Sequence, residues 1–343
     1  MIKVTELRGT RKAAYIAENV NNLHILEVGP SGSGKSVAGS ILEKNAASEG
    51  AAVIGISMNQ AITPPTGVTN VRVIYVKEQG LPISVLSDIP VHVKDGRSSN
   101  ELIADAVDAF CTISNLHVRQ KKALGEAIKR AMQSDIWRQN EFLAIEKELL
   151  SSKGDVEESV CAHFEQVLQS VCIHSDSSFH LDISGQIIIF ELSGYSLNIQ
   201  KQLTCYILAR IWQEARAQNR SGNVPWFIHL DEFQELGIRP DSTLYQILRE
   251  GRKFKLGTIL ATQTLEYFSR SERALLLQAS SKLFFSPEPH EIPRLLADIG
   301  QRGNMAMSRR LSLLQRGQCL AVGKYAVDTS VIEHPLVLDF TQR

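Results

Sequence analysis

The fold of this chain is decided by the stretch Gly29-Pro30-Ser31-Gly32-Ser33-Gly34-Lys35-Ser36, which satisfies the pattern G-x-x-x-x-G-K-[S/T]. The mostly apolar segment His24–Val28 before it reads as a buried strand, and apolar residues recur at helical spacing from Ser36 to Ala47. A glycine-rich turn between a strand and a helix lets backbone N–H groups surround phosphate groups. The stretch could also be a plain glycine turn that ends in a helix cap, but its position between strand and helix favours a phosphate-binding loop.

The residue types in this loop suit the binding of a nucleotide. Lys35 would reach the β- and γ-phosphates, and the Ser36 hydroxyl would be a ligand of Mg²⁺. ATP and Mg²⁺ are therefore the expected ligands. The nucleotide contacts are expected from the loop and the residue after it: Gly29, Pro30, Ser31, Gly32, Ser33, Gly34, Lys35, Ser36 and Val37.

A second apolar strand supplies the carboxylates that such a loop requires. Trp226–Leu230 ends in Asp231 and Glu232. Asp231 would hold the metal, largely through a water molecule, and Glu232 would act as the general base on the attacking water. Acidic residues after a strand can also cap a helix, a reading that the phosphate loop weakens. His229 lies on one side of this strand and is expected to pack in the sheet rather than to take part in catalysis.

A third apolar strand, Thr258–Ala261, ends in Thr262 and Gln263. Because the carboxyl ends of parallel strands meet at one edge of a sheet, Gln263 is expected beside the two nucleotide motifs. Its amide could donate to a γ-phosphate and accept from the attacking water, and so sense whether ATP or ADP is bound. The alternative is an ordinary polar residue at a strand end.

Just before this strand, Arg249–Lys255 holds four cations in seven residues. Such a run is often a solvated face. The sharper interpretation is that Arg252 stabilises the charge of the transition state, either in its own subunit or across a subunit boundary. With Arg252, the expected catalytic residues are Glu232 and Gln263.

Strands alternate with helices over most of the chain, which predicts an α/β fold with a mostly parallel, twisted sheet flanked by helices. Residues 100 to 175 show only helical periodicity, so we expect an all-helical insertion packed at the sheet edge. The expected organisation is a first part of the core at 1–96, the insertion at 97–175 and a second part of the core at 176–343. Further strands are expected at 52–56, 71–76, 186–192, 283–285 and 319–322.

Composition excludes several classes of protein. The 343 residues are 43% hydrophobic, which allows a sizeable core, and 37 basic side chains balance 37 acidic ones, so a polyanionic partner must meet a local patch. The five cysteines lack the spacing of a disulfide framework or a zinc site. We expect no membrane span, no signal peptide and a cytoplasmic location.

Three segments together resemble the HerA/FtsK superfamily of RecA-like motor ATPases: the phosphate loop, the strand ending in Asp231-Glu232, and above all Arg249–Gln263. Gly185–Gly194 and Leu311–Leu320 resemble further segments of that group, and the likeness runs from about residue 20 to 335. Its HerA branch, with relatives among conjugation and type IV secretion ATPases, is the most similar. The resemblance implies a ring, commonly a hexamer, that binds ATP between subunits and moves a polymer through its pore.

The sequence departs from this family in ways that leave questions open. Many members carry a small β-barrel before the loop, and the residues before Gly29 are too few for one, so a partner such as a nuclease or a secretion component is expected instead. Many members also carry an arginine on the strand after Ala-Thr-Gln, here Ser281–Ser286, which has none. The finger arginine therefore stays open among Arg252, Arg294 and Arg302.

Three functions fit the sequence. The first is an ATPase that threads double-stranded DNA, with phosphate contacts from Arg302, Arg309, Arg310 and Arg316, although this basic region could equally be a solvated helix flank. The second is a secretion or conjugation ATPase that acts on protein cargo, which the neutral net charge suits slightly better. The third is a non-motor, ATP-dependent interaction switch.

Overall fold

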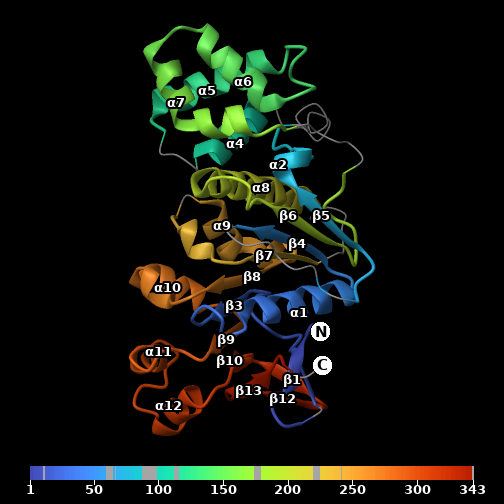
Figure 1. The fold of residues 1–343 in the computed structure, drawn as a ribbon, viewed down its shortest axis with the longest axis vertical. Helices are drawn as coiled ribbons and strands as arrows, with labels where there is room; N and C mark the ends of the chain where they lie inside the picture. The colour runs from blue at the N-terminus through green and yellow to red at the C-terminus, as the bar shows by residue number, and fades with distance from the viewer. Residues whose placement is uncertain are drawn as a thin grey trace.

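The computed structural model describes residues 1–10, 12–58, 65, 67–86, 99–111, 116–173, 179–218, 225–240 and 242–341. In this part of the chain the strands form one 13-stranded sheet, ordered β12-β11-β2-β1-β13-β10-β9-β3-β8-β7-β4-β6-β5. The molecule is elongated, with a helical cap at one end and the antiparallel part of the sheet at the other (Figure 1).

One half of the sheet is parallel and confirms the expected α/β core. Its strands are β9 (Ser281–Phe285), β3 (Ile25–Val28), β8 (Leu256–Thr262), β7 (Trp226–Leu230), β4 (Ala52–Ser57), β6 (Ile187–Glu191) and β5 (Val71–Tyr75). In the register of β3, Val28 pairs with Thr262 on one side and Phe284 on the other. The loops that follow β3, β7 and β8 therefore leave the sheet at the same edge.

The other half of the sheet is antiparallel, so the whole sheet is mixed and the mostly parallel pattern holds for the core alone. Its strands are β10 (Gln318–Gly323), β13 (Leu336–Asp339), β1 (Lys3–Leu7), β2 (Ala13–Ile16), β11 (Tyr325–Val327) and β12 (Ser330–Ile332). Tight turns between consecutive strands make such antiparallel pairing possible. Asp328, at φ 52°, adopts the left-handed conformation in the short connection between β11 and β12.

The two faces of the core strands are covered by different helices. Side chains on one face, such as Ile25 and Phe227, pack with the buried residues of α1 (Lys35–Ser48). The alternate residues, such as Leu26 and Ile228, pack on the other face with α8 (Leu197–Gln218) and α9 (Thr243–Glu250). This alternation follows from the two-residue period of a strand. The remaining helices are α2 (Val76–Gln79), α10 (Arg270–Leu276), α11 (Ile292–Asp298) and α12 (Met305–Ser312).

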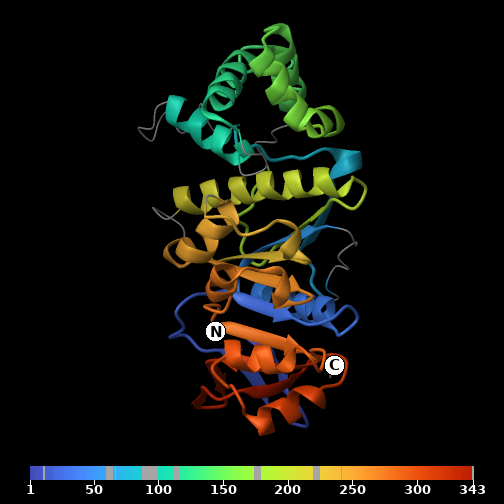
Figure 2. The same cartoon turned by 90° about the vertical axis from the view of Figure 1, so that its left-hand side faces the viewer.

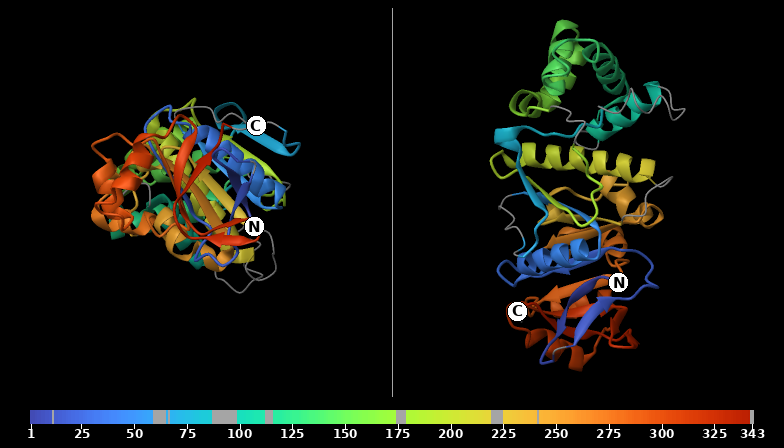
Figure 3. Two further views of the ribbon diagram at one scale, coloured as in Figure 1. Left: turned by 90° about the horizontal axis from the view of Figure 1, so that it is seen from below. Right: turned by 90° about the vertical axis from the view of Figure 1, so that its right-hand side faces the viewer.

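The expected helical insertion is present as α4 (Ser99–Cys111), α5 (Val118–Ala131), α6 (Glu141–Ser151) and α7 (Asp155–Ser170). The sequence predicted that this insertion packs directly on the sheet edge, and that prediction was wrong. Instead α4 and α7 contact α8, which lies as a single long helix between the insertion and the sheet (Figures 2 and 3). The helix α8 can take this role because it buries apolar residues toward both neighbours. The proposed domain boundaries at 96/97 and 175/176 lie outside the described residues.

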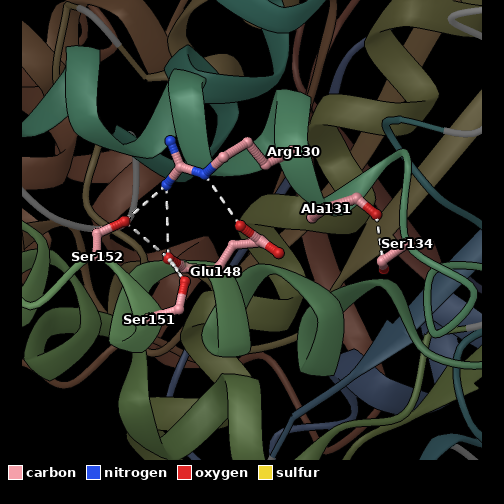
Figure 4. A network of polar contacts seen from close by, with 6 residues as sticks. All are labelled: Arg130, Ala131, Ser134, Glu148, Ser151 and Ser152. Carbon is pink, nitrogen blue, oxygen red and sulfur yellow. Dashed lines mark hydrogen bonds and ion pairs between the residues drawn. The ribbon is translucent and has the colours of Figure 1, made fainter.

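A polar network joins two helices of the insertion near their C-terminal ends (Figure 4). Arg130 of α5 donates from Nε to Oε2 of Glu148 on α6 at 2.9 Å and from Nη2 to the Ser152 hydroxyl at 2.8 Å. The hydroxyls of Ser151 and Ser152 donate in turn to the Glu148 carbonyl, each at 3.0 Å. The network fixes how α5 crosses α6.

Among the described helices, none is both long and apolar enough to cross a bilayer.

Candidate nucleotide-binding site

A cavity of about 670 Å³ opens at the carboxyl edge of the parallel strands. It is lined by the phosphate loop and α1, by the ends of β4, β7 and β8, and by the segment before β10. The lining residues are Ser31, Gly32, Gly34, Lys35, Ser36, Val37, Met58, Asp231, Glu232, Gln234, Glu235, Gln263, Tyr267 and Arg316. The three sequence motifs thus converge on one cavity.

The conformation of the phosphate loop requires glycine at two points. A Cβ on Gly29 would lie 2.3 Å from the Phe285 carbonyl oxygen, and Gly34 has φ 111°, in the left-handed region. The helix α1, which is described in full, begins without a capping side chain or an acidic residue in its first turn. Because the first residues of this helix line the cavity, its first N–H groups are available to an anion there.

Lys35 is buried at the base of the loop. Its Nζ donates to the carbonyl oxygens of Gly29 at 2.6 Å and Pro30 at 3.1 Å. Burial lowers the pKa of this ammonium, and the nearby carboxylates of Glu232 and Asp231 act in the opposite direction. A phosphate would replace neutral carbonyl partners with an anionic one, which is a stronger interaction. In the same loop the buried Ser33 hydroxyl has no hydrogen-bond partner within the described residues.

Ser36 and Asp231 lie together as a divalent cation requires. The Ser36 hydroxyl donates to Oδ2 of Asp231 at 3.2 Å, although the two residues are 195 positions apart. A hydroxyl and a carboxylate are hard oxygen ligands, and Mg²⁺ is commonly held by one or two such groups together with waters and phosphate oxygens. The donor set therefore fits Mg²⁺, with Ser36 and Asp231 as the protein groups beside it.

Glu232 occupies a strained position at the end of β7. Its φ of 55° and ψ of 40° place a residue with a side chain in the left-handed region, a strain typical of functional sites. Gln263 donates from Nε2 to both carboxylate oxygens at 3.2 Å, and Gln234 donates to Oε2. These contacts hold the carboxylate in the cavity opposite Lys35. Gln263 is thus placed where the sequence predicted it, and it also orients Glu232.

A buried polar group lies beneath the loop, on the face of the sheet that α1 covers. His229 Nδ1 contacts Oε1 of Glu43 at 2.7 Å, and the nearby Glu27 carboxylate has no hydrogen-bond partner among the described residues. Burial works against the charged form of His229, but Glu43 prevails and raises its pKa to about 9. Burial raises the pKa of Glu27 to about 8. As expected, His229 is packed in the sheet.

The arginines considered as fingers do not line the cavity. Arg252 lies on the turn Gly251–Phe254, exposed before the first residue of β8, whereas Gln263 follows its last residue. The seven residues of β8 span roughly 20 Å at the rise of a strand. Arg252 therefore cannot act on the nucleotide of its own subunit, which corrects that part of the prediction. Arg294 pairs with Glu266 at 3.0 Å, and Arg302 is exposed after α11.

Sequence reasoning missed several residues of the cavity. Met58 follows β4, so the rule that loops at the carboxyl edge form the site could have found it. Gln234 follows Glu232 at a spacing of two but belongs to no pattern that marks it. Arg316 was expected on a basic face that could contact DNA, and the structure places it on the wall of the nucleotide cavity instead. Tyr267 lies on the turn Leu265–Tyr267 just after Gln263.

No protein-family model matches this chain, and no curated protein matches it. Solved structures do match. VirB4 of Thermoanaerobacter pseudethanolicus gives a TM-score of 0.66 at 13% sequence identity over 98% of this chain and 95% of that chain. The chain has the same fold as VirB4.

Structures of the bacterial conjugative coupling protein TrwB share this fold. The unbound monoclinic form gives a TM-score of 0.67 at 12% identity, over 95% of this chain and 86% of that chain. The complex of TrwB with ADP and Mg²⁺ gives 0.63 at 13% identity, over 96% and 91%. At such identities the similarity establishes the fold, and the activity has to be argued from the site itself.

Proposed function

We propose that this protein is a Mg²⁺-dependent ATPase that works as a ring-forming motor on double-stranded DNA. One observation carries the ATPase part: Lys35, Ser36, Asp231, Glu232 and Gln263, from three separate strand ends, line a single cavity. A structural ion pair or a helix cap needs two such groups, whereas the five together supply the phosphate, metal and water contacts that nucleotide hydrolysis uses.

Each group has a role that follows from its position. Lys35 and the N–H groups of the loop bind the β- and γ-phosphates. Mg²⁺, when bound beside Ser36 and Asp231, neutralises charge that develops on the phosphate oxygens. Glu232 accepts the proton of the attacking water, and Gln263 keeps its carboxylate aimed at that water. The proposal places the protein in the cytoplasm, where ATP and Mg²⁺ are abundant.

ATP turnover with three variants tests the proposal. Lys35→Ala should abolish nucleotide binding because the phosphates lose their buried cation. Glu232→Gln should keep ATP bound but lower turnover by roughly 10²- to 10⁴-fold, the usual contribution of a general base. Glu18→Gln, at an exposed carboxylate outside the cavity, is the matched control and should behave as wild type. Equal loss of binding in the first two variants would contradict the separate roles.

Two features support the motor part of the proposal. The first is the fold that this chain shares with VirB4 and TrwB, together with the resemblance of its sequence to HerA/FtsK motor ATPases. The other is a set of exposed cations near α12, Arg302, Arg309 and Arg310, which form no ion pair with the described residues and so are available to phosphates. Duplex DNA should raise ATP turnover, and the effect should weaken steeply with salt. Light scattering should detect an assembly larger than one chain.

Protein cargo is the second candidate, and the balance of 37 basic against 37 acidic side chains favours it over a general attraction to DNA. The same turnover assay separates the two. Stimulation by duplex DNA supports the first candidate, and unchanged turnover over a range of DNA and salt concentrations counts against it.

A further inference from the structure

The cavity contains a cation that the roles above do not use. Among the described residues that line it, two carry a positive charge: Lys35, which is buried under the loop, and Arg316, which is exposed. Arg316 forms no ion pair within the described part of the chain. The lining carboxylates belong to Asp231, Glu232 and Glu235. Lys35 supplies positive charge at the base of the cavity, and Mg²⁺ would supply it beside Ser36 and Asp231. Arg316 is the remaining cation among the described lining residues.

Arg316 is attached firmly to the phosphate loop. The N–H of the next residue, Gly317, donates to the Ser33 carbonyl at 2.8 Å, and the Gly317 carbonyl accepts from the N–H of Phe340 at 2.9 Å. A Cβ on Gly34 would lie 2.8 Å from the Gly317 Cα, so the two turns are in direct contact. The backbone that carries Arg316 thus moves with the loop that would hold the phosphates.

The turn itself is closed by its own hydrogen bonds. The N–H of Gln318 donates to the Gln315 carbonyl at 2.9 Å, and the N–H of Gln315 donates to Oε1 of Gln318 at 3.2 Å. The side chain of Gln318 is anchored in turn, because its Nε2 donates to Oδ2 of Asp339 on β13 at 3.1 Å. Arg316 therefore projects from a fixed point, and its entropy cost on binding is limited to its own side chain.

The order of the strands places Arg316 on the side away from the hydrolytic groups. Asp231, Glu232 and Gln263 follow β7 and β8, which lie on one side of β3. Arg316 precedes β10, which lies beyond β9 on the other side of β3. A triphosphate with its γ-phosphate between Gln263 and Lys35 must therefore extend its nucleoside end toward Arg316. Val37, which also lines the cavity and has 55% of its surface exposed, offers an apolar contact.

We propose that Arg316 binds the α-phosphate end of the nucleotide, the part that ADP and ATP share. This inference rests on the proposed ATPase function. It makes Arg316 a binding residue for both nucleotides and not a sensor of the γ-phosphate. Its guanidinium can donate two parallel hydrogen bonds to phosphate oxygens, which a lysine ammonium cannot reproduce with the same geometry.

Calorimetric titration with ADP and with ATP tests the inference, in a Glu232→Gln background that prevents turnover. Arg316→Ala should weaken both nucleotides by a similar factor of about ten, the effect of losing one exposed charge-assisted contact. Arg316→Lys should recover part of the loss. Arg8→Ala removes an exposed arginine from the turn between β1 and β2, away from the cavity, and should leave both affinities unchanged.

Three results would overturn the inference, and the third would also overturn the proposed ATPase function. Selective weakening of ATP by Arg316→Ala would place the arginine at the γ-phosphate. Unchanged affinities for both nucleotides, with binding still lost in Lys35→Ala, would leave the ATPase proposal standing and remove this role. If the protein with Lys35 and Arg316 intact binds neither nucleotide, the proposed function itself fails. Circular dichroism confirms in each case that the variant is folded.

Discussion

Replacement of Glu27 by glutamine should change how the stability of this protein depends on pH. Glu27 lies on β3, two residues before the phosphate loop, and its side chain is fully buried. Neither carboxylate oxygen has a hydrogen-bond partner within the described residues, and burial raises the pKa to about 8. The folded protein therefore prefers the neutral acid. Glutamine has nearly the same shape and cannot ionise, so Glu27→Gln isolates the effect of this proton.

The sign and size of the effect follow from the two pKa values. Below the ordinary value of 4.5 the carboxyl is neutral in both states, and it does not affect the free energy of unfolding through ionisation. Between 4.5 and about 8 the unfolded chain releases the proton while the fold retains it, so stability falls as pH rises. At about 1.4 kcal/mol per unit, the loss between about pH 5 and about pH 7.5 is on the order of 3 kcal/mol.

Urea unfolding of the wild type and of Glu27→Gln at these two pH values measures this loss. All other groups titrate in both proteins, so the difference in unfolding free energy between them should shift by about 3 kcal/mol in favour of the glutamine variant as pH rises. A difference that stays the same at both pH values would refute the reasoning. It would mean that Glu27 is ionised in the fold, held by His229 or Lys35.

Three further changes test other parts of the structure. Gly39→Ala places a Cβ 2.6 Å from Cε1 of His229 and should destabilise the fold by about 1–3 kcal/mol in urea unfolding; an unchanged midpoint would show that the ring can move. Arg252→Ala should lower ATP turnover at least about tenfold with unchanged ATP affinity if it acts across a subunit boundary, and normal turnover in the assembled state would exclude that role. Arg130→Ala should lower the local stability of α5 and α6 by about 1 kcal/mol and so speed their amide hydrogen exchange, with no change in ATP turnover. Unaltered exchange would show that the contact to Glu148 does not hold these helices together.

The residues that hold the phosphates could be predicted from sequence because each belongs to a short local pattern. In each case an apolar strand is followed by polar or glycine residues: β3 by the loop Gly29–Ser36, β7 by Asp231 and Glu232, and β8 by Gln263. In a parallel sheet, strands that run in one direction bring their ends to one edge, so local patterns imply a shared site. The structure adds the distances, such as 3.2 Å between the Ser36 hydroxyl and Oδ2 of Asp231.

The sequence predicted one strand of the antiparallel half, 319–322, which is β10. The pairing of this half could not be predicted in the same way. Strands β11 and β12 are three residues long, too short for the two-residue alternation to be distinct from chance. The pairing of β1 with β13 joins residues more than 300 positions apart, for example Leu7 with Leu338. Register over such a distance depends on the packing of the whole fold, and no local signal specifies it.

The place of Arg316 was missed for a related reason. Its position follows from a backbone contact between Gly317 and Ser33, and a backbone hydrogen bond leaves no requirement for a particular side chain. Arg309, Arg310 and Arg316 therefore look equivalent in sequence. In the structure the first two lie exposed on α12, while the third lines the cavity. Arg252 shows the converse, since a suggestive run of cations lies at the far end of β8 from the site.

The most direct test of the central claim is an experimental structure of Glu232→Gln with ATP and Mg²⁺. The account predicts the γ-phosphate between Lys35 and Gln263, with the metal beside Ser36 and Asp231. A nucleotide bound elsewhere, or a metal held without Ser36 and Asp231, would contradict it.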